Sequence, residues 1–183
     1  MIVPALGRHL YVCALREVQP ILDRDKAFWH IVSIRTPMSP PAARFRWALD
    51  VLPLVFDDIE TAGTPEAEGL RPVQVEDLKK VFAFLDERPG KPMLIHCRAG
   101  VSRSTGLALL LIARGMIQRG DPDVTTAAVD QLLALRPHAV PNCRILELGL
   151  AQCMPADRAR EVMVTMSNHP QLIQNRFINP NRE

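Results

Sequence analysis

The segment LIHCRAGVSRSTG, residues 94–106, places a cysteine, a glycine and an arginine between an apolar strand-like run and an apolar helix-like run. Five residues separate Cys97 from Arg103, enough to wrap a loop around one tetrahedral anion with the backbone N–H groups facing inward. Gly100 lets the backbone approach such an anion closely. A helix that begins near Ser102 or Arg103 directs the positive end of its dipole to the same point. The pattern therefore predicts an oxyanion site.

The residue types in this loop also indicate a reaction. The planar guanidinium of Arg103 can bind two phosphate oxygens at once, which a lysine could not do. The same positive surroundings favour the thiolate form of Cys97, which is the nucleophilic form. Attack on phosphorus would give a covalent thiophosphate that water must release, and the hydroxyl of Ser104 could hydrogen-bond to the departing sulfur. We therefore predict cysteine-based hydrolysis of a phosphate ester.

Such a reaction needs a general acid for the leaving group, and a carboxyl group could then act as the base that activates water. Asp57 and Asp58 directly follow the apolar run at 49–56. Neighbours on an extended chain point in opposite directions, so only one of them faces the site easily. Spacing from the strand LPLVF favours Asp58. Asp57 is the alternative, and Glu60 is a third candidate.

The composition predicts one folded domain over residues 1–183, because 48% of the residues are hydrophobic and 23% are charged. The formal charge of +2 is too small to recruit nucleic acid or a membrane as a main partner. The four cysteines have no CxxC pairing or metal-ligand spacing, which favours reduced thiols in the cytoplasm and predicts neither a metal site nor a cofactor. These cysteines are Cys13, Cys97, Cys143 and Cys153.

Apolar runs alternate with helical periodicity along the chain. The strand-like runs are 9–15, 30–35, 49–56 and 91–96, and the helix-like segments are 16–28, 75–85, the run through 107–112, 123–135 and 144–152. This alternation predicts an α/β fold with a central, mostly parallel sheet of four to five strands flanked by helices. Ligands bind at the carboxyl ends of such strands. We expect loops at 36–47 and 59–72, and a tail at about 167–183 that is partly irregular.

The sequence HCRAGVSRS resembles the HCxxGxSRS signature of the cysteine-dependent protein tyrosine phosphatase superfamily, in particular its dual-specificity branch. HLYVCAL, HIVSIR, LPLVFDD and RPHAVPN are similar to flanking segments of that family, so the resemblance covers a core of about residues 9–152. The chain looks most like a compact bacterial tyrosine phosphatase. Two features depart from the family pattern: the aspartates precede Cys97 by 39 or 40 residues, further than is usual, and no Trp-Pro-Asp motif is present.

The resemblance implies a phosphatase-type P-loop at the strand-to-helix junction. In it, Cys97 would be the nucleophile, Arg103 the phosphate clamp and Ser104 the group that assists breakdown of the intermediate. His96 would orient the surroundings of the cysteine, and Asn142 would support the site. The phosphate-binding loop itself would consist of Arg98, Ala99, Gly100, Val101 and Ser102.

The implied function is metal-independent removal of phosphate from phosphotyrosine, extended in the dual-specificity branch to phosphoserine and phosphothreonine. The substrate would be a phosphorylated protein or a small phosphate ester, and phosphate, sulfate or vanadate should bind the loop. Three alternatives stay open: a phospho-ligand binding module with weak turnover, sulfur or arsenate chemistry on a related cysteine loop, and a phosphoinositide, nucleotide or RNA end as substrate. A protective disulfide between Cys13 and an oxidised Cys97 is also open.

Overall fold

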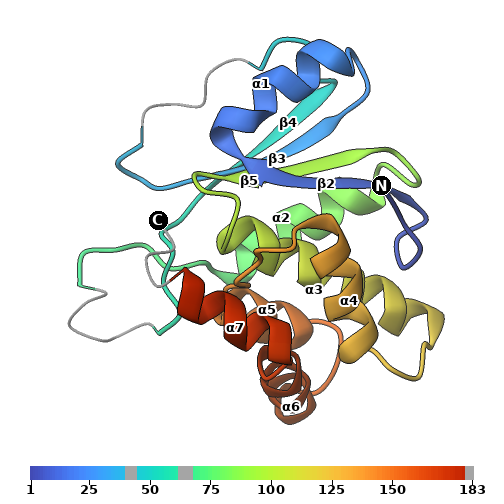
Figure 1. The fold of residues 1–183 in the computed structure, drawn as a ribbon, viewed down its shortest axis with the longest axis vertical. Helices are drawn as coiled ribbons and strands as arrows, with labels where there is room; N and C mark the ends of the chain where they lie inside the picture. The colour runs from blue at the N-terminus through green and yellow to red at the C-terminus, as the bar shows by residue number, and fades with distance from the viewer. Residues whose placement is uncertain (40–44, 62–67, 180–183) are drawn as a thin grey trace.

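The computed structural model of the protein describes residues 1–39, 45–61 and 68–179, so the expected loops at 36–47 and 59–72 and the end of the tail lie partly outside the described residues. The described chain has the predicted α/β architecture, with a central sheet and flanking helices (Figure 1). The strands are β1 (Ile2–Val3), β2 (Arg8–Ala14), β3 (His30–Arg35), β4 (Asp50–Val55) and β5 (Met93–Cys97). The helices are α1 (Leu15–Arg24), α2 (Val75–Asp86), α3 (Arg103–Arg119), α4 (Thr126–Leu135), α5 (Cys143–Leu150), α6 (Ala156–Ser167) and α7 (Pro170–Ile178).

The sheet confirms the prediction of a mostly parallel arrangement. Its strand order is β1-β2-β5-β3-β4, and every pairing is parallel except that of the short β1 with β2. The register aligns Ala14 of β2 with Cys97 of β5, and Ser33 of β3 with His96. The carboxyl ends of β2, β3 and β5 therefore lie at the same end of the sheet, next to the start of the loop that follows β5.

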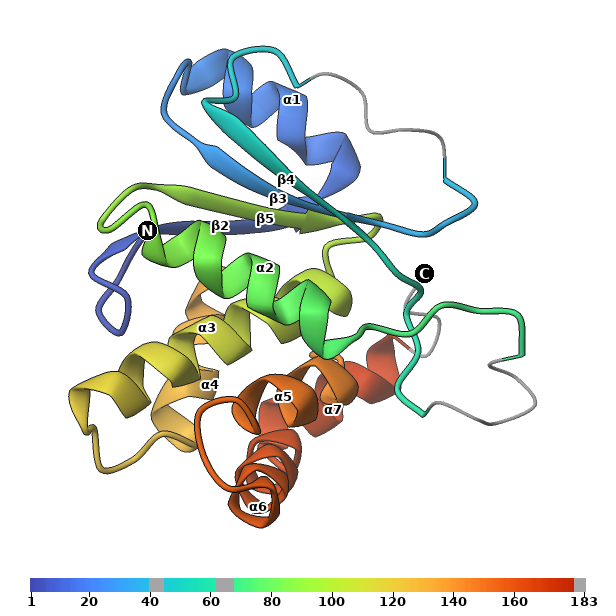
Figure 2. The ribbon, with the colours of Figure 1, turned by 180° about the vertical axis from the view of Figure 1, so that it is seen from behind.

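Helices cover the two faces of the sheet unequally. Figures 1 and 2 show α1 alone on one face and the other helices, α2 to α7, on the opposite face. Because successive strand side chains alternate between faces, Leu94 packs in the cluster under α1 whereas Ile95 packs in the larger core. The same alternation puts Cys13 under α1 and Cys97 in the larger core.

β4 forms one edge of the sheet, a position that tolerates the proline in its middle. Pro53 is exposed and aligns with Ser33, and the parallel pairing of β3 with β4 runs unbroken from His30↔Asp50 to Arg35↔Val55. The proline is therefore accommodated without interrupting the sheet.

The carboxyl-terminal part of the chain is more helical than predicted. The helix α6 was not assigned from the sequence, and residues 170–178 of the tail that was expected to be partly irregular form α7. Met166 of α6 and Leu172 of α7 are each 1% exposed and belong to the main hydrophobic core. These helices are therefore part of the folded body that carries the site.

None of the helices within the described residues has the length and apolar character that crossing a bilayer requires.

Candidate active site

A loop at 98–102 joins the fully buried strand β5 to the almost fully buried helix α3. Backbone carbonyls of this loop accept hydrogen bonds from groups around its outside. The pairs are Leu15 N to Arg98 O at 3.2 Å, Arg136 Nε to Gly100 O at 3.1 Å, Val140 N to Val101 O at 2.9 Å and Gly106 N to Ser102 O at 2.7 Å. Carbonyls fixed on the outside leave the peptide N–H groups to face the inside, which is the arrangement that a tetrahedral anion requires.

Gly100 is required in this loop for two reasons. Its φ is +71°, a left-handed conformation that other residues rarely adopt. A Cβ at this position would lie 2.5 Å from Ala14 N and 2.5 Å from Cys13 C, so the loop could not pass this close to β2 with a larger residue. The close approach brings the N–H of Gly100 to 3.2 Å from Cys97 Sγ, to which it donates.

Cys97, the expected nucleophile, is 2% exposed and lies at the bottom of the loop. Besides the Gly100 N–H, its sulfur is 3.2 Å from Ser104 Oγ. Hydrogen-bond donors of this kind stabilise a negatively charged sulfur more than a neutral thiol. The structure therefore brings Cys97, Gly100 and Ser104 together in the arrangement that a thiolate nucleophile needs.

His96 precedes the cysteine and lies on the α1 side of the sheet, next to Cys13 in the register of β2 and β5. Burial lowers the pKa of its imidazole to about 4, although proximity to the Cys97 backbone partly opposes this shift. The ring packs edge-on against Phe45, with centroids 5.2 Å apart. His96 is thus a neutral packing residue behind the loop at neutral pH.

Asp58, the favoured acid, lies directly against the loop. Its Oδ1 accepts hydrogen bonds from Ser102 Oγ at 2.7 Å and from Asn142 Nδ2 at 2.8 Å. Its Oδ2 lies 3.6 Å from Arg103 Nε, and the carboxylate side chain is only 5% exposed. The structure therefore brings Asp58, Ser102, Arg103 and Asn142 to one point.

The two other acid candidates make different contacts. Asp57 is half-buried, and its Oδ2 accepts from Arg71 N at 2.8 Å. Glu60 Oε1 accepts from Cys143 N at the start of α5, at 3.4 Å. Asp58, by contrast, contacts Ser102 and Arg103 directly.

Arg103 is 2% exposed, and its Nη1 donates to Phe56 O at 3.0 Å, just beyond β4. Its Nε is buried, and no described residue accepts a hydrogen bond from it, because 3.6 Å to Asp58 is too long for one. A buried guanidinium N–H without an acceptor is costly unless a ligand supplies one. This donor suits a phosphate oxygen.

Asn142 connects the acid to the helical layer. It caps α5 by accepting from Ile145 N at 3.1 Å, and its Nδ2 donates to Ile59 O at 3.3 Å as well as to Asp58. A Cβ on Gly106 would lie 2.9 Å from Asn142 N, so α3 approaches Asn142 closely only because residue 106 is glycine. Asn142 therefore contacts Asp58, the predicted acid, directly.

Sequence reasoning assigned no role to two residues that shape the loop. Arg136 binds Gly100 O and also pairs with Glu17 Oε2, 3.3 Å from its Nη2. Thr105 Oγ1 donates to the carbonyls of Val101 and Ser102. Both residues bind backbone atoms, and the spacing of residues in a sequence does not show where backbone atoms will lie. The likeness of RPHAVPN to a family segment was the one signal that pointed to the region of Arg136.

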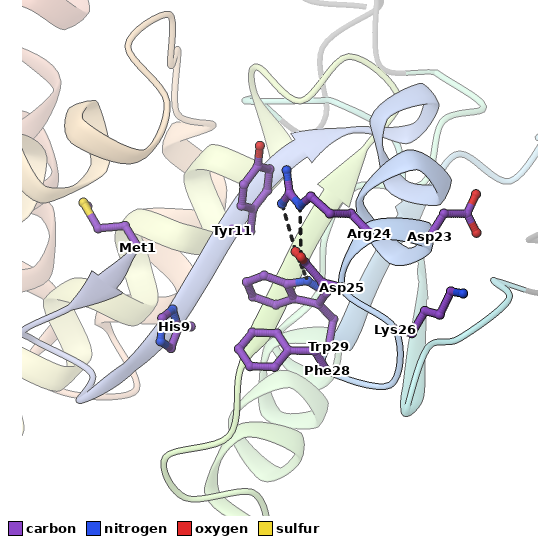
Figure 3. Close-up of a pocket in the computed structure, with 9 residues that line it drawn as sticks. All are labelled: Met1, His9, Tyr11, Asp23, Arg24, Asp25, Lys26, Phe28 and Trp29. Carbon is purple, nitrogen blue, oxygen red and sulfur yellow. Dashed lines mark hydrogen bonds and ion pairs between the residues drawn. The ribbon is translucent and has the colours of Figure 1, made fainter.

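A hollow of about 730 Å³ lies at the opposite end of β2, lined by residues that include His9, Tyr11 and Trp29 (Figure 3). His9 precedes Ala14 by five strand positions, about 16 Å at the rise of a β-strand. No loop residue lines this hollow, so chemistry and not cavity size locates the site. In the described ranges, no three His, Cys, Asp or Glu side chains are grouped to share a metal ion.

Comparison with known proteins agrees with this geometry. A family model described as protein-tyrosine phosphatase matches residues 67–154, which include α2, β5, the phosphate loop and α3 to α5. No curated protein matches the chain.

Solved phosphatase structures share the fold. The Yvh1 phosphatase domain from Chaetomium thermophilum is 22% identical, with 81% of this chain and 94% of that chain covered and a TM-score of 0.56. Human DUSP28 is 15% identical, with 87% and 96% covered and a TM-score of 0.55. Human tyrosine phosphatase-like serine/threonine/tyrosine-interacting protein is 16% identical, with 83% and 93% covered and a TM-score of 0.56.

Residues 67–154 thus match the protein-tyrosine phosphatase family, and the chain shares the fold of these phosphatase structures. The matched residues include Cys97, Arg103 and the loop between them. The three structures above come from Chaetomium thermophilum and human, so the expected likeness to a bacterial enzyme stays a prediction.

Proposed function

We propose that this protein removes phosphate from phosphotyrosine, and from phosphoserine or phosphothreonine where the site admits them, through a cysteinyl-phosphate intermediate. The observation that carries the proposal is the convergence of a buried thiol, a buried arginine and a buried carboxylate on one loop. Cys97 Sγ accepts a hydrogen bond from the N–H of Gly100, and Asp58 Oδ2 lies 3.6 Å from Arg103 Nε. The three groups would act as nucleophile, general acid and phosphate clamp.

In the first step, the Cys97 thiolate attacks phosphorus and the bond from phosphorus to the ester oxygen breaks. Asp58, in its protonated form, gives its proton to that oxygen, so the product leaves as a neutral alcohol or phenol. Arg103 and the inward N–H groups of the loop hold the oxygens of the transferring phosphoryl group, where negative charge is spread in the transition state.

In the second step, water attacks phosphorus and the sulfur–phosphorus bond breaks. The Asp58 carboxylate takes the proton of the water, which restores its protonated form. Ser104, 3.2 Å from the sulfur, donates a hydrogen bond to the departing thiolate. The sum of the two steps is hydrolysis of one phosphate ester by one water, with the protein unchanged.

The proposal is tested with the purified full chain and p-nitrophenyl phosphate, in the presence of a thiol reductant and EDTA. We expect hydrolysis between about pH 5 and 7.5 and, in parallel assays without EDTA, which chelates vanadate, competitive inhibition by vanadate. Comparison of phosphotyrosine and phosphothreonine peptides then measures specificity. Absence of hydrolysis under all these conditions would leave the phospho-ligand binding module as the better reading.

The proposal also includes the cellular compartment of the protein and the extent of its domain. All four cysteines are free thiols, which supports a reducing, cytoplasmic environment. Residues of α6 and α7 share the core with the strands that carry the site, which supports one phosphatase domain over residues 1–183.

A further inference from the structure

The segment 136–142 connects α4 to α5 and contacts the phosphate loop along its outer side. Arg136 Nε, Val140 N and Asn142 N donate to the carbonyls of three successive loop residues, at 3.1, 2.9 and 3.4 Å. These contacts fix three peptide planes of the loop at positions 100–102. The conformation of this segment therefore determines how the anion-binding N–H groups are aimed.

The segment has few means of holding its own shape. Pro137 and Pro141 have no backbone N–H, so neither can donate a hydrogen bond. Ala139 N closes one turn onto Arg136 O at 3.0 Å. Ala139 and Val140 are fully buried, and a buried carbonyl without a donor is costly. Part of the segment's support must therefore come from outside it.

Asn175 of α7 supplies that support. Its amide nitrogen donates to Pro137 O at 2.8 Å and to Ala139 O at 2.9 Å, and the residue is 2% exposed. Its Oδ1 accepts from Gln171 Nε2 at 3.2 Å, one helical turn earlier. Both amide hydrogens and the amide oxygen are thus used, which fixes the orientation of the side chain. Figure 1 shows α7 in red in the layer below the sheet.

We propose that Asn175 is a positioning residue for the phosphate loop and acts through the segment 136–142. Its hydrogen bonds to the segment hold the carbonyls of Pro137 and Ala139. The residues that flank these carbonyls, Arg136, Val140 and Asn142, donate the hydrogen bonds that hold the loop. The inference rests on the proposed oxyanion site and adds α7 to the elements that form it.

The test uses full-length variants and measures binding of inorganic tungstate, a phosphate analogue, by calorimetry, together with thermal unfolding. Asn175→Asp keeps the shape of the side chain but turns a donor into an acceptor that faces two carbonyls. Asn175→Ser removes both hydrogen bonds without adding charge, and serves if the first variant does not fold. The control is Leu172→Ala on the same helix, which removes buried apolar contacts but no hydrogen bond to the segment.

We expect the two Asn175 variants to raise the tungstate Kd at least about tenfold at a temperature where they are folded, with a matching fall in kcat/KM. Leu172→Ala should lower the melting temperature and leave Kd within about twofold of the wild type. The inference is overturned if the Asn175 variants keep the wild-type Kd, or if Leu172→Ala weakens binding equally.

Tungstate binding separates this inference from the proposed function, because it does not require turnover. A wild-type chain that binds tungstate but hydrolyses no ester contradicts the proposed function and still permits the comparison of variants. A wild-type chain that binds no oxyanion overturns both.

Discussion

Two cysteines at the same end of the sheet lie in opposite chemical environments, one on each face. Cys13 on β2 and Cys97 on β5 are both buried, and their strands are neighbours in the sheet. Under α1, burial raises the pKa of the Cys13 thiol to about 12. On the other face, Cys97 meets the N–H of Gly100 and the hydroxyl of Ser104. Burial alone makes a cysteine inert, whereas burial among donors can make it reactive.

The residues next to the two cysteines follow the same division. His96 lies on the α1 side of the sheet as a neutral, desolvated imidazole. Asp58 lies on the side of the helical layer, where Asn142 and the loop hold it. The predicted catalytic groups thus lie on the face that α3 and α5 cover, and the face that α1 covers holds packing residues.

The largest effect should separate the two cysteines. Cys97→Ser is expected to lower kcat for p-nitrophenyl phosphate by about 10⁴-fold or more, because the nucleophile is lost. Cys13→Ala should stay within about threefold of the wild type, since it removes only a small buried group. Steady-state hydrolysis with equal amounts of folded protein measures both. Similar losses in the two variants would contradict the division between the faces.

The next effect should separate the two aspartates. Asp58→Asn should lower kcat about 10²-fold, because the amide cannot protonate the leaving oxygen. The loss should grow for alkyl phosphates, whose leaving groups need the proton more. Asp57→Asn should change kcat less than about threefold, since Asp57 binds Arg71 N. If Asp57→Asn is the slower variant, the acid has been assigned to the wrong carboxylate.

A third effect concerns stability on the α1 face. The pKa of His96 is about 4 in the folded protein, below its ordinary value of 6.5. Between these values the unfolded chain binds a proton that the folded chain does not, so stability is lost as the pH falls from 6.5 to 4. The loss approaches about 3 kcal/mol at and below the lower value.

Urea unfolding at pH 7 and pH 4.5 measures this loss, and His96→Asn should reduce it. The exposed His138 provides the matched control, because His138→Asn should leave the pH dependence unchanged. An unchanged slope in His96→Asn would mean that other groups cause the acid sensitivity.

The smallest expected effect concerns a disulfide between Cys13 and Cys97, which we expect not to form. Cys97 is close enough to Cys13 to raise its pKa, but the two side chains pack in separate clusters on opposite faces, so the disulfide that the sequence left open requires the ends of β2 and β5 to rearrange. After mild peroxide treatment, peptide mapping by mass spectrometry should find no Cys13–Cys97 link. The Cys13→Ala variant should recover activity on reduction as the wild type does. A linked peptide would show that the sheet edge rearranges on oxidation.

Much of the fold could be predicted because apolar runs and prolines act locally. The strands of the parallel sheet and the loop after β5 both follow from short stretches of sequence. The helix α6 could have been found, since Ala159, Val162 and Met166 are buried at helical spacing. The helix α7 could not be found in this way, because Leu172 and Asn175 are its buried residues and one of them is polar.

The candidate site could be predicted only as far as its loop. HCRAGVSRS is contiguous, so its residue types reveal the anion cradle. Selection of Asp58 depends on contacts with Ser102 and Asn142, which are 44 and 84 residues away in the chain. Such distances cannot be read from spacing, because they depend on how α3 and α5 pack.

The edge strand β4 also bears on how the protein behaves at high concentration. An open edge of a sheet offers its free backbone groups to another chain, and edge-to-edge pairing of this kind starts aggregation. Pro53 has no N–H, and pairing with β3 is continuous on its inner side, so the missing donor falls on the open side. A second strand would meet a gap in its ladder there, which protects the folded protein from growing into a larger sheet.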